Sequence, residues 1–161
     1  MLLSYKENNI LIDCGEGTQR QFRKAEINPC KLTHILITHW HGDHVLGLPG
    51  LLQTLMLNGY NKTLRIYGPK GTKQMLSLYL SLFVNQNKIS IETHEINEGI
   101  FLQNEYFLLE TEKMQHETPS LAYSFIIKEK NRLDKEKLKK LHLPSSPLIA
   151  QLREGKTIEI N

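Results

Sequence analysis

The residues with the clearest chemical potential lie in the run His39–His44, which reads His-Trp-His-Gly-Asp-His. Imidazole and carboxylate groups are the ligands that Zn²⁺ and related divalent metals accept in proteins. Alternate positions on a short turn direct His39 and His41 at one ion, and Asp43 and His44 can then face a second ion. Four such side chains within six residues rarely arise by chance. The run therefore predicts a metal site.

The other histidines give weaker signals. His116 lies in a polar stretch that ends at Pro119, and taken alone it fits an exposed loop residue as well as it fits a metal ligand. We expect His34 to be packed or hydrogen-bonded, and His94 and His142 to lie at the surface. Without further information, the metal prediction is confined to the first run.

Predicted strands and helices must position the metal-ligand run. The apolar stretch His34–Thr38 is typical of a strand buried on both faces, and the leucine spacing in Leu48–Met56 predicts a helix. Another strand, Asn9–Asp13, enters the turn Cys14–Gly17, whose glycines permit a sharp change of direction. Thr18 is the expected N-cap of the next helix. Strands mixed with helices predict an α/β protein with helices packed on a sheet.

Periodicity also predicts the elements of the remaining chain. The expected helices cover Gln19–Glu26, Thr72–Val84 and Asp134–Leu141, and the expected strands cover Leu64–Tyr67, Ile89–Ile96, Ile100–Gln103, Glu105–Glu110, Leu121–Lys128 and Thr157–Ile160. The composition changes after Glu129, and the segment Lys128–Lys140 contains seven basic and three acidic side chains. Such a segment can hold phosphate groups by releasing counterions. A solvated helix face with internal ion pairs is the alternative, and charge alone favours that alternative.

Length and composition fit one ordinary domain. The chain has 161 residues, 40% of them apolar and 23% charged, with a net charge of +3. These values exclude collagen-like, coiled-coil and wholly disordered chains. The most apolar stretch, Val45–Leu57, is well short of the roughly 20 residues that span a membrane. Two cysteines, Cys14 and Cys30, are too few for a disulfide scaffold, so we expect reduced thiols, a cytoplasmic protein and no membrane contact.

The first run matches the signature of the metallo-β-lactamase superfamily, and other motifs resemble the ribonuclease Z family of tRNA 3′-processing endonucleases. Those motifs are Ile12–Gln21, Gly47–Leu52, Ile66–Pro69, His116–Tyr123, Glu129–Arg132 and Leu152–Gly155. The resemblance covers nearly the whole chain. It implies a partial metallo-β-lactamase fold, an αββα sandwich. Residues 1–128 would form the N-terminal part of that domain, and residues 129–161 a basic arm segment that grips tRNA.

The resemblance also implies roles for particular residues. Five metal ligands are implied, His39, His41 and His116 for one zinc ion and Asp43 and His44 for a second. Asp43 is also implied to accept a proton from the attacking water. Asp13 would support the metal site from beneath, and a turn-capping aspartate is an equally good interpretation. The tRNA-binding residues would be Lys135, Lys137, Lys139 and Lys140, the substrate precursor tRNA, and the intact enzyme a homodimer.

The sequence departs from the family pattern at several places. Trp40 replaces a smaller aliphatic residue, and we expect its bulk to narrow the approach to the metals. Ser146-Pro147 replaces a Gly-Pro pair in the arm, and His142 replaces a glycine. The family's first strand and its second half, with further metal ligands, have no counterpart here. Three functions therefore remain open: a tRNA endoribonuclease, a hydrolase of small phosphodiesters or esters, and a catalytically incomplete metal- or RNA-binding fragment.

Overall fold

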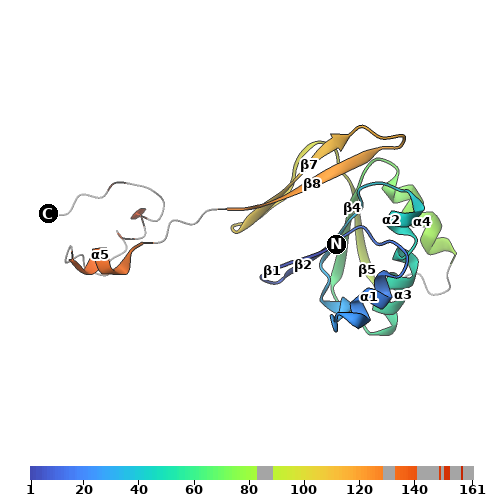
Figure 1. Cartoon of the computed structure of the whole chain (residues 1–161), viewed down its shortest axis with the longest axis horizontal. Coiled ribbons are helices and arrows are strands. Elements are labelled where there is room, and N and C mark those ends of the chain that lie inside the picture. The colour runs from blue at the N-terminus through green and yellow to red at the C-terminus, as the bar shows by residue number, and fades with distance from the viewer. Residues whose placement is uncertain (83–88, 129–132, 141–148, 150, 153–156, 158–161) are drawn as a thin grey trace.

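The structure is a computed structural model of the chain, and its described part comprises residues 1–82, 89–128, 133–140, 149, 151–152 and 157. Two β-sheets pack face to face, and helices cover the outer face of the larger sheet (Figure 1). Three layers, one of helices and two of strands, therefore surround two apolar cores.

The larger sheet has five strands in the order β1-β2-β3-β4-β5. These are β1 (Leu2–Tyr5), β2 (Asn8–Ile12), β3 (His34–Leu36), β4 (Thr63–Gly68) and β5 (Ser90–Glu95). Strands β2 to β5 run parallel, and only β1 is antiparallel to its neighbour. The carboxyl ends of the four parallel strands therefore share one edge, which is where open α/β sheets bind their ligands.

The helices and the short 3₁₀ turn follow the strands in the chain. They are α1 (Thr18–Lys24), η1 (Pro29–Lys31), α2 (Gly42–Val45), α3 (Leu48–Leu57) and α4 (Thr72–Ser81). Alternation along β3 divides its side chains between the two faces of the sheet. Ile35 packs toward the helices, against a core that includes Leu51, whereas Leu36 packs toward the second sheet. The side chains of Ile35 and Leu36 are both fully buried, as the apolar sequence of this strand predicts.

The smaller sheet contains β6 (Gly99–Gln103), β7 (Phe107–Met114) and β8 (Ser120–Ile127), paired antiparallel in that order. Phe107 and Leu109 of β7 pack against Leu36 and Tyr67 of the larger sheet. The hydroxyl of Tyr123 on β8 donates a hydrogen bond of 2.8 Å to the carbonyl oxygen of Ile37. This contact fixes the smaller sheet beside the carboxyl end of β3.

The structure changes some of the expected boundaries. Thr18 is the first residue of α1, and Gly17, with φ of 75°, is the N-cap. The Thr18 hydroxyl instead donates to the carbonyl oxygen of Gly15, so its predicted capping role is wrong. Strand β1 is absent from the sequence-based assignment because Lys6, with φ of 53°, makes a tight hairpin turn that no glycine marks. Strand β7 begins two residues later than predicted and extends to Met114.

Helix α5 (Lys135–Lys140) confirms a helix within the basic segment. The Asp134 side chain accepts hydrogen bonds from the backbone amides of Glu136 and Lys137 at 2.9 and 3.2 Å. Asp134 therefore caps this helix. Figure 1 shows α5 apart from the two sheets. Three other predictions, for His142, Ser146-Pro147 and Thr157–Ile160, fall wholly or largely outside the described residues.

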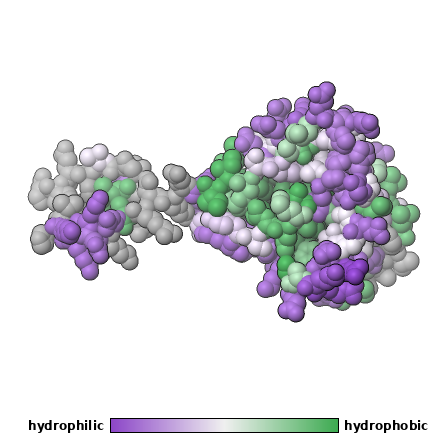
Figure 2. Space-filling view, in the orientation of Figure 1, coloured by the Kyte–Doolittle hydropathy of each residue, from purple (hydrophilic) through white to green (hydrophobic). Residues whose placement is uncertain are grey.

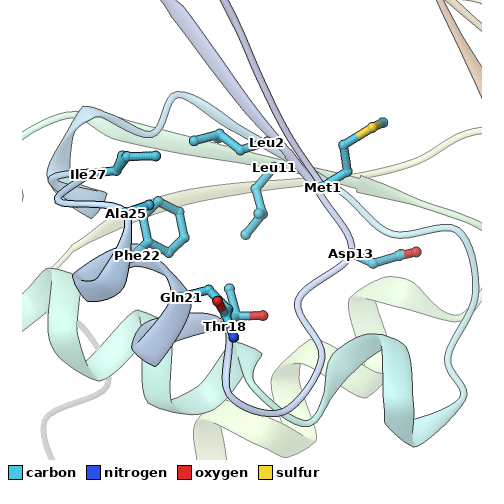
Figure 3. Close-up of a pocket in the computed structure, with 9 residues that line it drawn as sticks. All are labelled: Met1, Leu2, Leu11, Asp13, Thr18, Gln21, Phe22, Ala25 and Ile27. Atoms are coloured by element: carbon cyan, nitrogen blue, oxygen red, sulfur yellow. The ribbon is translucent and has the colours of Figure 1, made fainter.

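A mostly apolar cleft of about 340 Å³ lies between α1 and the β1–β2 hairpin (Figure 3). Leu2, Leu11, Phe22 and Ile27 line it, and Figure 2 shows apolar surface on the face where this hairpin lies. Asp13 stands at one side of the cleft in Figure 3. None of the helices in the described part of the chain has the length and apolar character needed to cross a membrane.

Candidate metal centre

Two loops at the carboxyl edge of the large sheet are joined backbone to backbone. The Cys14 amide donates to the His44 carbonyl at 2.7 Å, and the Gly47 amide donates to the Cys14 carbonyl at 2.9 Å. A Cβ atom on Gly15 would lie 2.1 Å from the carbonyl oxygen of Asp43, and one on Gly47 would lie 2.0 Å from that of Gly15. Both positions require glycine because the backbones touch there. The turn after β2 thus supports the loop after β3.

Three histidines converge at this edge. The candidate ligand nitrogens of His39, His41 and His116 all lie within 4.8 Å of one another. His39 Nε2 is 3.1 Å from His41 Nδ1, and the ring of His116 lies 4.8 Å from that of His39. The first two follow β3, whereas His116 belongs to the connection between β7 and β8. Packing of the two sheets therefore assembles a cluster from residues far apart in the sequence.

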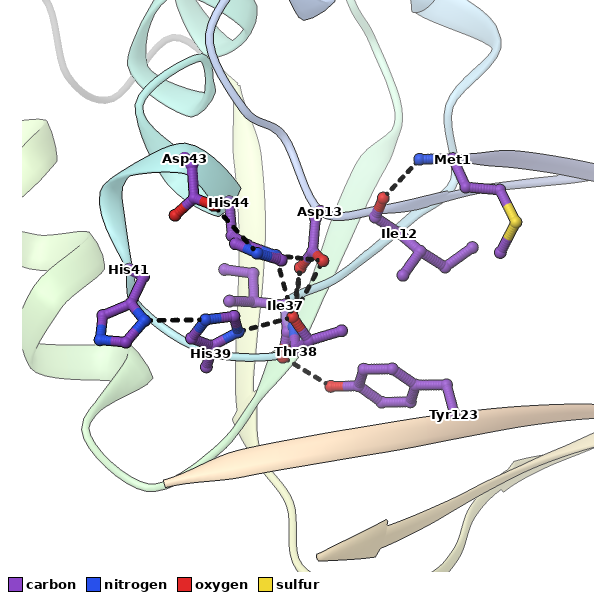
Figure 4. Close-up of polar contacts among 10 residues, drawn as sticks. All are labelled: Met1, Ile12, Asp13, Ile37, Thr38, His39, His41, Asp43, His44 and Tyr123. Carbon is purple, nitrogen blue, oxygen red and sulfur yellow. Dashed lines mark hydrogen bonds and ion pairs between the residues drawn. The ribbon is translucent and has the colours of Figure 1, made fainter. Parts of the chain in front are cut away.

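Asp13 fixes which nitrogen of His39 is free. The Asp13 carboxylate only accepts hydrogen bonds, so the Thr38 hydroxyl, 2.9 and 3.0 Å from its two oxygens, must donate its hydrogen there. The same hydroxyl oxygen, 3.0 Å from His39 Nδ1, then accepts a hydrogen bond from that nitrogen. The lone pair of His39 consequently resides on Nε2, which faces the cluster (Figure 4). Such outer partners fix the tautomer of a metal-ligating histidine.

The same carboxylate orients His44. His44 Nδ1 lies 2.7 Å from Asp13 Oδ2 and donates to it, so the His44 lone pair is on Nε2. That nitrogen lies 3.4 Å from Asp43 Oδ2. Two hydrogen-bond acceptors that face each other repel unless a cation or a proton lies between them. With a neutral His44 ring the pair can hold a metal ion between them, and with a protonated ring it forms an ion pair; the Asp43 side chain is 80% exposed.

The backbone at Asp13 adopts a rare conformation that serves these contacts. Its φ is 55°, in the left-handed region that few non-glycine residues occupy. The Thr38 amide donates to Asp13 Oδ1 at 2.8 Å, which with the contacts above holds the carboxylate in place. Strained positions of this kind persist where the surroundings determine them, and they are frequent at functional sites. The structure favours the supporting role of Asp13 over a turn cap.

Burial keeps His39 in the form that a metal needs. Its pKa is lowered from the ordinary value, first because the ring is removed from water, and then because positive charge on His44, His41 and His116 would repel it. A metal-ligating histidine must be neutral, so a lowered pKa extends metal binding to more acidic solutions.

The donor set fits a divalent transition metal. Zinc–nitrogen bonds of about 2.0–2.1 Å in tetrahedral geometry place two ligand nitrogens about 3.4 Å apart. The separation of 3.1 Å between His39 and His41 is close to that value. Three imidazoles are also the ligand type that first-row divalent metals share. The cluster is therefore suited to bind a metal ion.

Trp40 does not narrow the approach to the metal cluster, and that prediction is wrong. Its indole Nε1 donates to the hydroxyl of Thr72 on α4 at 2.9 Å, and its ring packs edge-on against Tyr79 at 5.6 Å. The side chain packs on the helix-facing core. Alternation along an extended segment explains this, because neighbours of His39 and His41 must point to the opposite side.

Several other expectations are confirmed. His34 is buried, and its Nδ1 lies 2.8 Å from the Thr33 hydroxyl. His94 is exposed and stacks on Tyr67. Both cysteines are free, and burial raises the pKa of Cys14 to about 12, so it is an inert core thiol. Lys137, Lys139 and Lys140 are exposed on α5, and the backbone of Lys135 begins that helix; that these four lysines bind tRNA stays a prediction. None of these lysines belongs to the histidine cluster.

Two residues that support the site were given no such role from the sequence. Thr38 transmits the Asp13 contact to His39, and Tyr123 anchors β8 beside the cluster. A hydroxyl before the first ligand is the signal that could have revealed Thr38. Tyr123 ends the family motif His116–Tyr123, but the sequence did not indicate its role, because its partner is the backbone carbonyl of Ile37, just after β3.

Comparisons with known proteins show a family and several related chains. The family profile described as anti-Pycsar protein Apyc1 matches residues 1–137. The chain is 40% identical over 161 residues to ribonuclease Z of Nanoarchaeum equitans, covering 100% of this chain and 51% of that protein. It is 41% identical over 152 residues to ribonuclease Z of Methanocaldococcus jannaschii, and the match covers 92% of this chain and 48% of that protein. The chain thus spans about half the length of the curated relatives it matches.

Solved structures show the same fold. Human tRNase Z, short form, matches with a TM-score of 0.71 and 30% identity, over 79% of this chain and 56% of that one. The metallo-β-lactamase fold protein YhfI of Bacillus subtilis matches with a TM-score of 0.58 and 21% identity, over 77% of this chain and 48% of that one. The expected metallo-β-lactamase fold, in partial form, is confirmed.

Proposed function

This chain belongs to the family described as anti-Pycsar protein Apyc1 and has the metallo-β-lactamase fold, and we propose that it carries the metal centre of an endoribonuclease that removes the 3′ trailer from precursor tRNA. Similarity to ribonuclease Z over the full length of the chain supports this reaction. The observation that carries the proposal is the convergence of His39, His41 and His116 where the parallel strands end. The reaction is hydrolysis of one phosphodiester bond.

We further propose that the metal is zinc and that two ions bind. His39, His41 and His116 would hold one ion, and Asp43 and His44 would hold the other. Support for the second ion comes from the two acceptors that face each other at 3.4 Å. When bound, the divalent ions would lower the pKa of a bound water molecule and would place positive charge beside the phosphate.

The residues of the chain contribute orientation and proton transfer. Asp43 would orient the attacking water and accept its proton; its exposed carboxylate, 3.4 Å from His44 Nε2, supports this role. Asp13 holds His44 in one tautomer and, through Thr38, does the same for His39. These contacts hold the two rings in place, so that the Nε2 lone pairs of His39 and His44 would point at the metal ions throughout the reaction.

The basic segment would bind the body of the tRNA. Lys135, Lys137, Lys139 and Lys140 lie on one short helix, α5, and their charges would neutralise RNA phosphates. Binding through phosphates releases counterions, so affinity should fall steeply as salt rises. We propose residues 1–128 as the metal-binding part and residues 129–161 as the arm. The protein would act in the cytoplasm, and the intact enzyme would be a homodimer.

Cleavage of a precursor tRNA with a labelled 3′ trailer tests the proposal. A complete enzyme that carries this segment should, with zinc, cut at the end of the mature tRNA, and His39→Ala should abolish the cut. A variant with glutamine at the four arm lysines should bind tRNA more weakly and with a flatter salt dependence, yet cut a small chromogenic diester as before. Tight tRNA binding with no cleavage would instead show a catalytically incomplete RNA-binding fragment.

A second function follows from the family profile, whose description names an anti-Pycsar protein and no tRNA enzyme. The same histidines could serve a hydrolase of small phosphodiesters or esters. Such an enzyme would cut the small diester and leave precursor tRNA intact. The arm substitutions would then have no effect on any substrate.

A further inference from the structure

A cleft of about 390 Å³ opens directly beside the histidine cluster. His116 is part of its lining, so the cleft and the candidate metal centre share a side chain. Three connections form its walls: the turn after β4, the turn after β5 and the connection between β7 and β8. The first two follow the carboxyl ends of parallel strands, where ligands bind in open α/β sheets. No predicted site residue other than His116 lines this cleft.

The lining combines cations with apolar surface. Lys70 and Lys113 both line it, from different walls, and both are exposed. Pro69, Met114 and Pro119 supply apolar surface, and Met114 is 54% exposed at the end of β7. A pocket with an apolar lining and a few polar groups is typical of small-ligand sites.

We propose that this cleft is a nucleotide subsite, which holds the nucleotide next to the phosphate that is cut. The base would lie on Met114 and the prolines, and its phosphate would lie between Lys70 and Lys113. A nucleotide combines both properties, because its base has an apolar face and its phosphate is an anion. This inference rests on the proposed function in choosing an RNA nucleotide; apart from His116, the residues of the lining are not metal-ligand candidates.

One acid in the lining sharpens the ligand class. Glu117 also faces the cleft, and its negative charge opposes the two lysines. A bare phosphate ion therefore gains little here, and apolar contact with the base has to add to the binding. We expect uridine monophosphate to bind better than either inorganic phosphate or uridine.

Titration of the ¹⁵N-labelled full chain with uridine monophosphate in a chelator tests the subsite. Without metal, the amide signals of Lys113, His116 and Leu121 should shift, with a dissociation constant on the order of 1 mM. The double variant Lys70→Gln/Lys113→Gln should weaken binding about tenfold, since each lysine contributes a charge-assisted contact. Lys73→Gln is the matched control, because Lys73 is exposed on α4 and does not line the cleft.

The outcomes separate this inference from the proposed function. Unchanged binding in the double variant, shifts that map elsewhere, or no binding by the unsubstituted chain would each overturn the subsite. Precursor-tRNA cleavage is measured separately with zinc. Loss of cleavage with retained lysine-dependent nucleotide binding would count against the proposed function and leave the subsite in place.

Discussion

The two ends of strand β3 each carry a buried histidine, and only one of them belongs to the metal centre. His34 at the amino end contacts a hydroxyl and stacks on Tyr67, with ring centres 6.1 Å apart. His39, just past the carboxyl end, faces two other imidazoles. Their exposed fractions are nearly the same, 5% and 8%. Burial of a histidine therefore says little about its role, whereas the groups that surround it decide that role.

The largest expected effect comes from the carboxyl end. His39→Ala removes the most buried nitrogen ligand, so zinc affinity should fall by more than about 100-fold, beyond the range seen for outer partners of a metal. Competition with a chromophoric chelator measures this affinity. His94→Ala is the matched control, because His94 is exposed on β5, and it should change the affinity less than twofold.

The amino end should instead govern acid stability. Burial, and secondarily the positive charge of Arg65, lowers the pKa of His34 to about 4 from an ordinary value of 6.5. Protonation therefore favours the unfolded chain, so this histidine costs nothing above pH 6.5 and destabilises progressively as pH falls toward 4. The loss is about 3 kcal/mol.

Urea unfolding of the metal-free chain at pH 7 and pH 4 measures this effect. The difference between the two pH values should be about 3 kcal/mol smaller in His34→Gln than in the natural chain. Zinc affinity at pH 7 should be equal in both. An undiminished acid sensitivity in the variant would contradict the assignment of His34 as a neutral core residue.

A smaller effect is expected at the support beneath the metal centre. Asp13→Asn keeps a side chain that tolerates the left-handed backbone, but it removes the charge that accepts from Thr38 and His44. Zinc affinity should decrease by about 10- to 100-fold. Thr38→Val removes the hydroxyl that links Asp13 to His39 and also contacts His44 Nδ1 at 3.3 Å. An affinity unchanged in both variants would contradict the proposal that these contacts fix the histidine tautomers.

The smallest effect is expected at Trp40. Trp40→Phe keeps an aromatic side chain but removes the indole N–H that donates to Thr72, and it should destabilise the fold by about 1 kcal/mol. Because the indole packs toward α4, zinc affinity and the rate on a small diester should change less than about threefold. A large increase in that rate would mean that Trp40 obstructs the metals after all.

The contrast along β3 also shows what sequence could reveal. The continuous apolar stretch His34–Thr38 located β3, and the spacing of His39, His41, Asp43 and His44 located the loop that follows. His116 could not be assigned from its own neighbours, because its role depends on packing between two sheets. Trp40 was misjudged because its bulk was weighed without its direction. Strand β1 was missed because a hairpin turn at Lys6 carries no glycine signal.

A cobalt titration of the full chain tests the central claim that His116 completes a metal site with His39 and His41. The first equivalent of Co²⁺ should give the intense visible bands of a four-coordinate ion, and His116→Ala should lose them or weaken the binding more than about 100-fold. Bands of the same intensity and affinity in His116→Ala would contradict the account, because the metal would then bind without the residue that the second sheet supplies.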